Sequence, residues 1–276
     1  MTYSNNTSFE DIQFIMEKSF NKEESEDAYF INDSLGIYGV MDGSTPIDKF
    51  KDEYGHNGAY LAANIFKNYF ESLNQIQYIH YEILQANQLL KQEMILNNID
   101  LYDKSQLWCT CVSAVQIKED KLIYASLGDT MILARDNKDN VNVLTVNTVK
   151  NISFRTKMRR EMSRHKCNDI QHERFFQNNY NKIADQRKMA NIPNGYSVAN
   201  GMEEAKHYIQ YGMLHVRDLK QILIMSDGLF DPKGDLISVF WKINELGLED
   251  YVKKMNHSER DNRSSSDDKT AILLTF

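Results

Sequence analysis

Residues 37–43 form an apolar, strand-like run that ends in an acidic residue and a glycine: Ile37-Tyr38-Gly39-Val40-Met41-Asp42-Gly43. Three more acidic motifs stand at the ends of apolar runs far away in sequence, namely Glu26-Asp27, Asp227-Gly228 and Asp267-Asp268. A buried carboxylate is costly unless a cation compensates it, so these motifs predict chain segments that converge on one metal site. Because the motifs lack His and Cys, they favour Mg²⁺ or Mn²⁺ over Zn²⁺.

Each motif alone has an ordinary structural explanation. Asp-Gly pairs are common in turns at strand ends, and this applies to Asp42-Gly43 and to Asp227-Gly228. Asp267-Asp268 alone fits a turn or a helix cap equally well. Only the combination of motifs and their order along the chain favours a metal site.

Five motifs in a fixed order resemble those of the metal-dependent, type 2C-like serine/threonine protein phosphatases, in their compact bacterial form. The resemblance extends from about residue 20 to the end of the chain. The motifs are Glu26-Asp27-Ala28, Gly39-Val40-Met41-Asp42-Gly43, Leu127-Gly128-Asp129-Thr130, Met225-Ser226-Asp227-Gly228-Leu229-Phe230-Asp231 and Asp267-Asp268-Lys269-Thr270.

This resemblance implies a fold and an activity. The fold is an α/β sandwich (α+β), in which two antiparallel β-sheets pack face to face and α-helices flank them. The activity is hydrolysis of phosphoserine and phosphothreonine in a phosphorylated protein substrate, by water that two Mn²⁺ or Mg²⁺ ions activate. Two rival functions stay open: a phosphatase for small metabolites, and a metal-binding pseudophosphatase that regulates a partner.

The resemblance also implies roles for individual residues. Asp42 bridges the two metal ions, and the backbone carbonyl of Gly43 contacts one of them. Asp227 and Asp267 complete the shell of one ion, so that Asp42, Asp227 and Asp267 are the predicted catalytic set. Glu26 and Asp27 hold the other ion, partly through water, and Asp129 joins Asp227 at a weaker third ion.

Two positions depart from the family pattern. Many members carry an Arg shortly before the Glu-Asp motif that grips the substrate phosphate, but residues 16–25 contain none. Lys22 is the nearest cation, and it is either the phosphate anchor or a solvated surface lysine. Many members also have a His after Asp-Gly, where this chain has Ser44.

The rest of the chain predicts alternating strands and helices within a single domain, residues 1–276. Strands are expected at 28–32, 37–41, 108–117, 122–126 and 130–135, and a turn and short strand at 194–198. Residues 214–216 and 221–225 are expected to form a hairpin. Apolar residues at helical spacing predict helices over 56–73, 76–96, 202–210 and 235–255, the last broken near Gly247.

Residues 154–190 form a basic helical segment in an acidic chain. Between Arg155 and Lys188 there are ten Lys and Arg against four Asp and Glu, whereas the whole chain carries a net charge of −7. The favoured interpretation is a solvated helical face that packs on the sheet through an apolar stripe including Met158 and Met162. The alternative is a basic rim that attracts a phosphorylated substrate.

Composition bounds the remaining classes. The net negative charge argues against nucleic-acid binding, and no apolar run is long enough for a membrane span. The polar residues 1–10 lack the apolar core of a signal peptide, and the chain has three cysteines, which predicts reduced thiols in the cytoplasm. We expect a monomer.

Overall fold

Strands make up the centre of the protein, in two five-stranded sheets within the part of the chain that the structure describes. The computed structural model describes residues 10–47, 49–164, 170–231, 235–262 and 266–276. The first sheet has the order β1 (Asp11–Glu17), β10 (Lys269–Thr275), β9 (Leu219–Met225), β6 (Met131–Asp136) and β7 (Val141–Val143). The second has the order β2 (Asp27–Asn32), β3 (Ile37–Gly43), β4 (Thr110–Lys118), β5 (Lys121–Leu127) and β8 (Gln210–His215).

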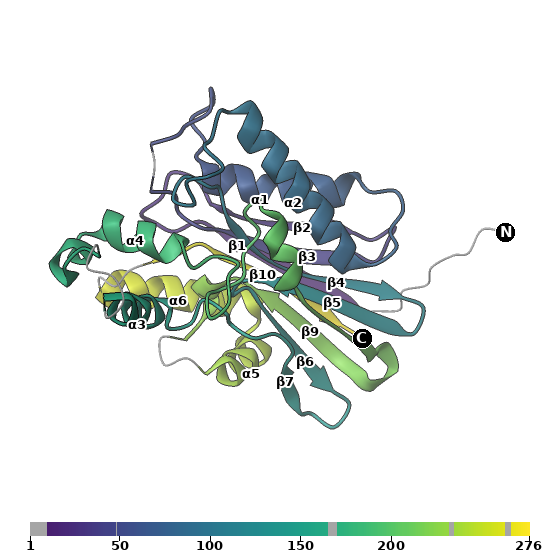
Figure 1. Cartoon of the computed structure of the whole chain (residues 1–276). Coiled ribbons are helices and arrows are strands. Elements are labelled where there is room, and N and C mark those ends of the chain that lie inside the picture. Colours follow the sequence, from purple (N-terminus) through teal and green to yellow (C-terminus); the bar gives the residue numbers. More distant parts are fainter. Residues whose placement is uncertain (1–9, 48, 165–169, 232–234, 263–265) are drawn as a thin grey trace.

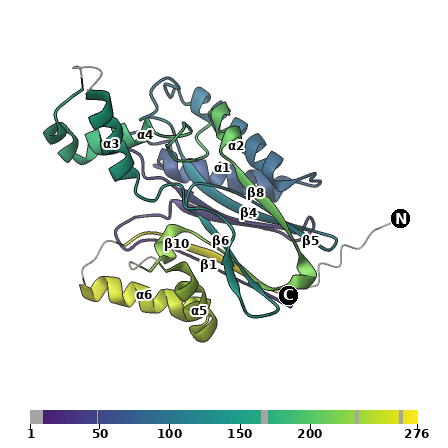
Figure 2. The same cartoon turned by 60° about the horizontal axis from the view of Figure 1, so that its bottom comes forward.

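Two pairs of helices cover the outer faces of these sheets (Figures 1 and 2). Helices α1 (Gly58–Ser72) and α2 (Ile79–Leu96) pack on the second sheet, and α5 (Leu236–Leu246) and α6 (Leu248–Asn262) pack on the first. All strand pairs in both sheets are antiparallel. The predicted α/β sandwich is therefore confirmed.

Side chains that alternate along each strand fill separate layers of the core. In β10, Ile272 and Leu274 pack between the two sheets, whereas Ala271 and Leu273 pack against α5 and α6. Both faces of β10 are buried, which explains its continuous apolar run. Apolar side chains fill the layers on both faces of the strands, so the acidic residues lie at the strand ends, at one edge of the sandwich.

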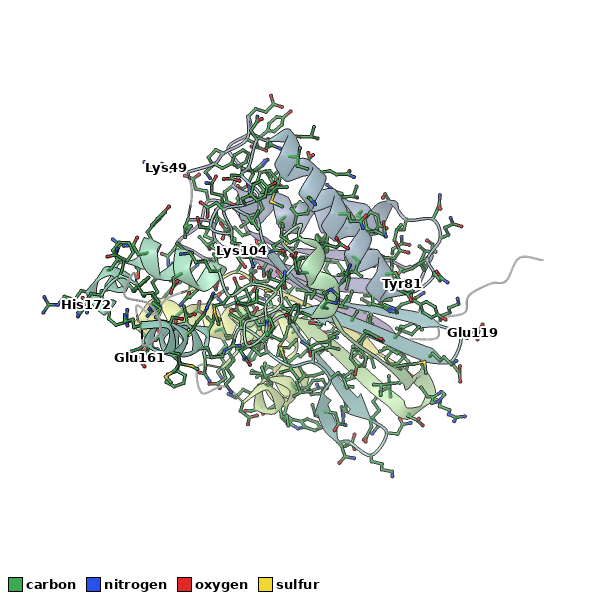
Figure 3. The ribbon with its side chains drawn as sticks, in the orientation of Figure 1. Lys49, Tyr81, Lys104, Glu119, Glu161 and His172 are labelled. Atoms are coloured by element: carbon green, nitrogen blue, oxygen red, sulfur yellow. The ribbon has the colours of Figure 1, made fainter. Side chains whose placement is uncertain are left out.

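The remaining helices lie beyond the end of the sandwich (Figure 2). They are α3 (Ile152–Arg164), the 3-10 helix Glu173–Gln177 and α4 (Asn179–Arg187). Glu161 and His172 of this region lie at the opposite end of the molecule from Glu119 in the β4–β5 turn (Figure 3). Further 3-10 helices span Glu203–His207, Val216–Asp218 and Asp227–Leu229.

Three sequence-based predictions of elements are wrong. The predicted hairpin of residues 214–216 and 221–225 does not form, since β8 pairs with β5 in one sheet and β9 pairs with β6 and β10 in the other. The short strand at 194–198 is reduced to an isolated bridge between Ala190 and Tyr196. Periodicity identifies a strand, but it carries no information about the partner strand across space.

The third error concerns the basic helical segment, residues 154–190. Its expected apolar stripe does not pack on a sheet, because Phe154, Met158 and Met162 are exposed and Thr156 is the buried residue of α3. The helix is instead attached through half-buried Ile152 and through contacts with α4.

The other predicted helices agree with the structure in three places and differ from it in one. The predictions over 56–73 and 76–96 correspond to α1 and α2, and the break at Gly247 separates α5 from α6, with a φ of 87°. The helix expected at 202–210 is only the 3-10 turn Glu203–His207. Every helix in the described ranges is too short or too polar to cross a bilayer.

Candidate functional site

Antiparallel pairing brings the acidic motifs to one edge of both sheets. Asp27 begins β2 and faces Asp42, which is near the end of β3. Strand β9 ends shortly before Asp227, and β10 begins shortly after Asp267. In an antiparallel sheet the end of one strand lies beside the start of its neighbour, so each pair of motifs meets there. Asp129 joins them from the turn in which the chain passes from β5 in one sheet to β6 in the other.

Four of the predicted acidic ligands line one cavity of about 230 Å³, together with Gly43. We call it the acidic cavity and define it by Asp42, Asp129, Asp227 and Asp267. The side chain of Asp267 is 58% exposed, so it stands at the mouth, whereas Asp129 is buried. A larger hollow of about 420 Å³ lies beside α2, away from these carboxylates, and is lined by residues such as Asn87 and Lys91.

Burial and nearby negative charges raise the pKa of the buried carboxyl groups in the cavity, those of Asp42, Asp129 and Asp227. Burial raises the pKa of Asp42 well above its usual range, and the charges of Asp227, Asp27 and Asp129 raise it further. Burial, followed by the charges of Asp129 and Asp267, raises the pKa of Asp227 to about 7, although a hydrogen bond with Asp42 partly offsets the rise. A metal cation beside these groups would stabilise their charged forms and lower their pKa values again.

Asp27 is buried but is not among the residues that line the cavity. Burial raises its pKa to about 8, and its Oδ2 atom is buried without a hydrogen-bond partner. The hydroxyl groups of Ser226 and Thr270 partly offset this rise. However, Thr270 Oγ1 is itself without a partner at hydrogen-bond distance, so the polar groups around Asp27 are incompletely satisfied.

Glu26 also lies outside the lining of the cavity, and neighbouring side chains hold its carboxylate. Asn57 caps α1 by accepting hydrogen bonds from the backbone N–H groups of Ala59 and Tyr60, and its Nδ2 donates to Glu26 Oε1 at 2.5 Å. Thr45 Oγ1 donates to Glu26 Oε2 at 2.9 Å. The start of α1 therefore sets the position of Glu26.

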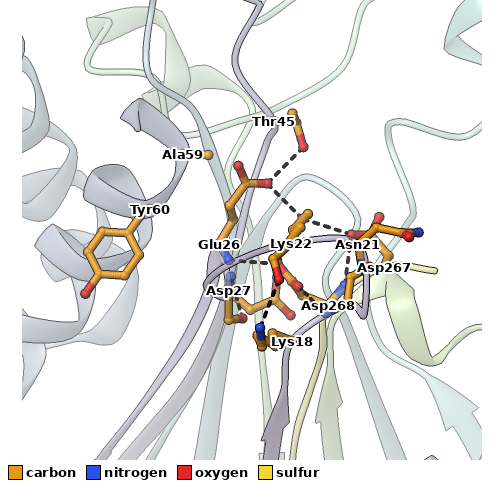
Figure 4. A network of polar contacts seen from close by, with 12 residues as sticks. Lys18, Asn21, Lys22, Glu26, Asp27, Thr45, Ala59, Tyr60, Asp267 and Asp268 are labelled. Carbon is orange, nitrogen blue, oxygen red and sulfur yellow. Dashed lines mark hydrogen bonds and ion pairs between the residues drawn. The ribbon is translucent and has the colours of Figure 1, made fainter. Parts of the chain in front are cut away.

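Lys22 is enclosed by carboxylates (Figure 4). Its Nζ lies 2.8 Å from Glu26 Oε2, 2.9 Å from Asp268 Oδ2 and 3.2 Å from Asp267 Oδ1. Hydrogen bonds with Glu26 and Asp268 outweigh the effect of burial and raise the pKa of Lys22. The interpretation as a solvated surface lysine is therefore wrong, while its role as a phosphate anchor stays a prediction.

A match to a family completes this description. A sequence model described as protein phosphatase 2C matches residues 21–267. The chain belongs to the protein phosphatase 2C family. This confirms the resemblance seen in the five motifs and the predicted enzyme class, that of the protein serine/threonine phosphatases. A search of the curated proteins finds no match.

Solved structures of other phosphatases share the fold. The chain is similar to serine/threonine phosphatase Stp1 from Staphylococcus aureus, at 18% identity and a TM-score of 0.58, over 98% of this chain and 96% of that one. It is similar to PstP/Ppp from Mycobacterium tuberculosis, at 12% identity and a TM-score of 0.58, over 96% and 98%. A PstP catalytic domain in complex with 2 manganese ions matches at 11% identity and a TM-score of 0.56, over 96% and 97%.

Gly43 of the family's Asp-Gly motif is required here by close packing. A Cβ atom at this position would lie 2.5 Å from the carbonyl oxygens of both Glu26 and Ala59. Its backbone N–H donates to the Glu26 carbonyl at 3.1 Å. The glycine thus holds the end of β3 against the start of β2 and the first turn of α1.

Asp268 has a role that sequence reasoning did not assign. It is almost completely buried, and its carboxylate accepts hydrogen bonds from the backbone N–H groups of Ser19 and Glu26, both at 2.7 Å. It thereby ties the segment that carries Lys22 to the residue just before β10. The sequence signal for this role was the pair of adjacent acidic residues, Asp267 and Asp268. Only Asp267 lines the cavity, so Asp268 is free for a different task.

The basic helical segment, residues 154–190, supplies further lining residues that the motifs did not reveal. Ile183, Gln186 and Arg187 of α4 line the acidic cavity, as do Ile152 of α3 and Tyr196. The local excess of positive charge in the sequence was the available signal for Arg187. Cys111, buried beside Asp129, also lines the cavity as a free thiol.

The donor atoms of the site fit a hard divalent cation. The described residues offer carboxylate oxygens from Asp42, Asp129, Asp227 and Asp267 in one cavity, with raised pKa values for the first three. As the side chains stand, no three His, Cys, Asp or Glu residues of the described ranges are grouped so that they could hold one ion.

Proposed function

We propose that this protein removes phosphate from phosphoserine and phosphothreonine in proteins, with two Mn²⁺ or Mg²⁺ ions in the acidic cavity. The observation that supports the proposal is the convergence of Asp42, Asp129, Asp227 and Asp267, from distant segments, on one cavity. When bound, the ions neutralise the phosphate charge and lower the pKa of a water nucleophile.

The predicted ligand roles are part of this proposal. Asp42 would serve both ions, the Gly43 carbonyl would serve one of them, and Asp227 and Asp267 would complete the shell of one. Glu26 and Asp27 would serve the other, partly through water, and Asp129 with Asp227 would serve a weaker third ion. Mg²⁺ keeps several waters, which suits the position of Glu26 and Asp27 outside the lining.

The protein's own residues have defined tasks in this scheme. Asp42 and Asp227 must lose the protons that burial now favours. Lys22 must release Glu26 and Asp267, while its contact with Asp268 can persist. Asn57 and Thr45 keep the Glu26 carboxylate oriented throughout.

A turnover assay tests the proposal. The purified chain should hydrolyse p-nitrophenyl phosphate and phosphoserine or phosphothreonine peptides with Mn²⁺ or Mg²⁺, and EDTA should abolish turnover. Full activity in metal-free buffer would overturn the metal role. Absence of turnover with metal would instead support the pseudophosphatase, and a clear preference for phosphorylated metabolites over peptides would support the metabolite enzyme.

The setting of the enzyme stays a prediction. We propose a single catalytic domain over residues 1–276 that acts as a monomer in the cytoplasm of a bacterium. Cys109 and Cys111 are free thiols, in keeping with a reducing compartment. Size-exclusion chromatography with light scattering measures the oligomeric state.

A further inference from the structure

Arg187, at the end of α4, is a buried arginine whose charge has no anionic partner among the described residues. Arg187 is 5% exposed, and it lines the acidic cavity together with Ser44 and Asp42. The Nη2 atom donates to the backbone carbonyls of Ser44 at 3.1 Å and Thr45 at 3.2 Å. The Nη1 atom is buried and has no hydrogen-bond partner.

Other arginines of the same helical segment are satisfied differently. Arg160 pairs with Glu173 at 2.8 Å and with Asp185 at 2.7 Å. Among the residues that the structure describes, no carboxylate lies within ion-pair distance of Arg187, and its hydrogen bonds go to carbonyl oxygens. Burying a guanidinium without a counter-ion costs free energy of folding, so we expect an anionic ligand to bind beside Arg187.

The groups around Arg187 do not supply that anion. The titratable groups that act on its charge are the Cys109 thiol, the Tyr196 hydroxyl and the Cys111 thiol. Burial raises the pKa of all three, and all three are therefore neutral near pH 7. The charge of Arg187 is available for a ligand that enters the cavity.

The chemistry of the cavity identifies the ligand as a phosphate group. A guanidinium offers several N–H donors in a planar fork that matches phosphate oxygens. The stretch before the Glu-Asp motif lacks an arginine, and Lys22 is engaged with three carboxylates. Arg187 therefore brings a guanidinium to the cavity from α4, a different part of the chain.

We propose that Arg187 binds the phosphate group of the substrate and positions it over the Asp42–Gly43 turn. The inference rests on the proposed function, because it assigns a substrate contact within that site. A purely structural role is the alternative, in which Arg187 only clamps the Ser44 and Thr45 carbonyls.

Two variants and one matched control separate these roles. Arg187→Gln removes the charge but keeps an amide that can donate to the two carbonyls. Arg187→Lys keeps the charge and loses the fork. The control is Arg155→Gln, because Arg155 lies in the same segment and also donates to backbone carbonyls, those of Thr148 and Gly195 among them.

The measurement is binding of inorganic phosphate to the Mn²⁺-loaded protein, by calorimetry and as a competitive inhibition constant. Arg187→Gln should weaken phosphate binding about 10-fold or more and raise KM for a phosphopeptide, as expected for loss of a charged hydrogen bond. Arg187→Lys should recover part of the loss. Arg155→Gln should lower Tm and leave phosphate affinity unchanged.

Two outcomes would overturn the inference. One is an Arg187→Gln variant with reduced Tm but unchanged phosphate affinity, which would leave only the clamp. The second outcome applies if Arg187→Gln does not fold. An Arg187→Lys variant that binds phosphate as tightly as the wild type would then overturn the inference, since a point charge does not reproduce the guanidinium fork. Failure of the proposed function can be told apart from failure of this inference. In that case the wild-type protein would show no turnover, while its phosphate binding could still be measured directly.

Discussion

The acidic cavity and the basic helical segment handle charge in opposite ways. In the cavity, carboxylates of like charge are buried together, and the pKa of Asp227 rises to about 7. In the helical segment, Glu173 lies between Arg160 and Arg164, and hydrogen bonds from Arg160 first lower its pKa to about 2. In the cavity the buried carboxyl groups have no cation beside them among the described residues, whereas Glu173 and Asp185 of the helical segment are both paired with arginines. Unsatisfied charge is therefore the better indicator of a functional site in this molecule.

The largest expected effect is on catalysis. Asp42→Ala, Asp227→Ala and Asp267→Ala should each lower kcat by more than about 100-fold, because each removes a charge from the metal shell. The matched control is Glu173→Ala, an acid of the helical segment with its own arginine partners, which should leave kcat near wild type. Steady-state kinetics on a phosphopeptide with Mn²⁺ measure both. Near wild-type kcat in all three aspartate variants would make these residues structural.

A second prediction concerns Lys22, the cation that neutralises the edge of the cavity. Lys22→Met leaves the buried Asp268 carboxylate without its ammonium partner and should destabilise the metal-free protein by about 2–3 kcal/mol. Mn²⁺ should recover part of the loss, since Glu26 and Asp267 would gain another cation. Urea unfolding with and without Mn²⁺ measures the difference. A loss that Mn²⁺ does not reduce would show that these carboxylates do not bind the metal.

The two regions should also respond to pH with opposite signs. The folded-state pKa values of Asp27, about 8, and Asp227, about 7, lie above the unfolded value near 4. Their stabilising contribution is therefore complete below about pH 4 and is lost as pH rises toward 8, at up to about 1.4 kcal/mol per pH unit for each group. In EDTA, Tm should fall between pH 5 and pH 8.

Mn²⁺ should reverse this trend, because metal binding requires the deprotonated carboxylates and strengthens over the same range. The lowered pKa of Glu173 acts in the other direction, and its contribution is lost only as pH falls from about 4 toward 2. Thermal unfolding at pH 5, 6, 7 and 8 with EDTA or Mn²⁺ checks the prediction. A Tm that rises with pH in EDTA would contradict the neutral carboxyl groups.

The smallest effect is expected within the helical segment. Arg160→Ala should cost about 1 kcal/mol of stability, because the side chain of Glu173 is one-third exposed and water partly screens the pair. It should not change kcat or phosphate affinity, in contrast to Arg187 variants. Urea unfolding and steady-state kinetics report the two quantities. A large loss of activity would show that the salt bridges of the segment position Arg187.

The sequence was sufficient for the architecture because local patterns record burial. Alternating or continuous apolar runs marked β3, β4, β9 and β10, and helical spacing marked α1 and α2. The edge strands β1 and β7 were missed. Both are edge strands with exposed positions, so their apolar pattern is weak.

The acidic motifs could also be recognised in the sequence, because each aspartate follows or precedes a buried strand with a clear apolar pattern. Asp42, Asp129, Asp227 and Asp267 could be assigned to one site because five short motifs occur in a family order. Lys22 was identified as a cation of interest, but its sequence neighbours do not reveal Asp267 and Asp268, which are more than 240 residues away.

The tertiary structure alone decided the contacts between distant segments. It placed β8 and β9 in different sheets and left Asp27 out of the cavity lining. It also brought Arg187 of α4 to the carbonyls of Ser44 and Thr45. A sequence determines which residues are apolar, charged or able to turn, and so which elements form. Which charges meet depends on how those elements pack, because burial and electrostatic partners are properties of distances in space.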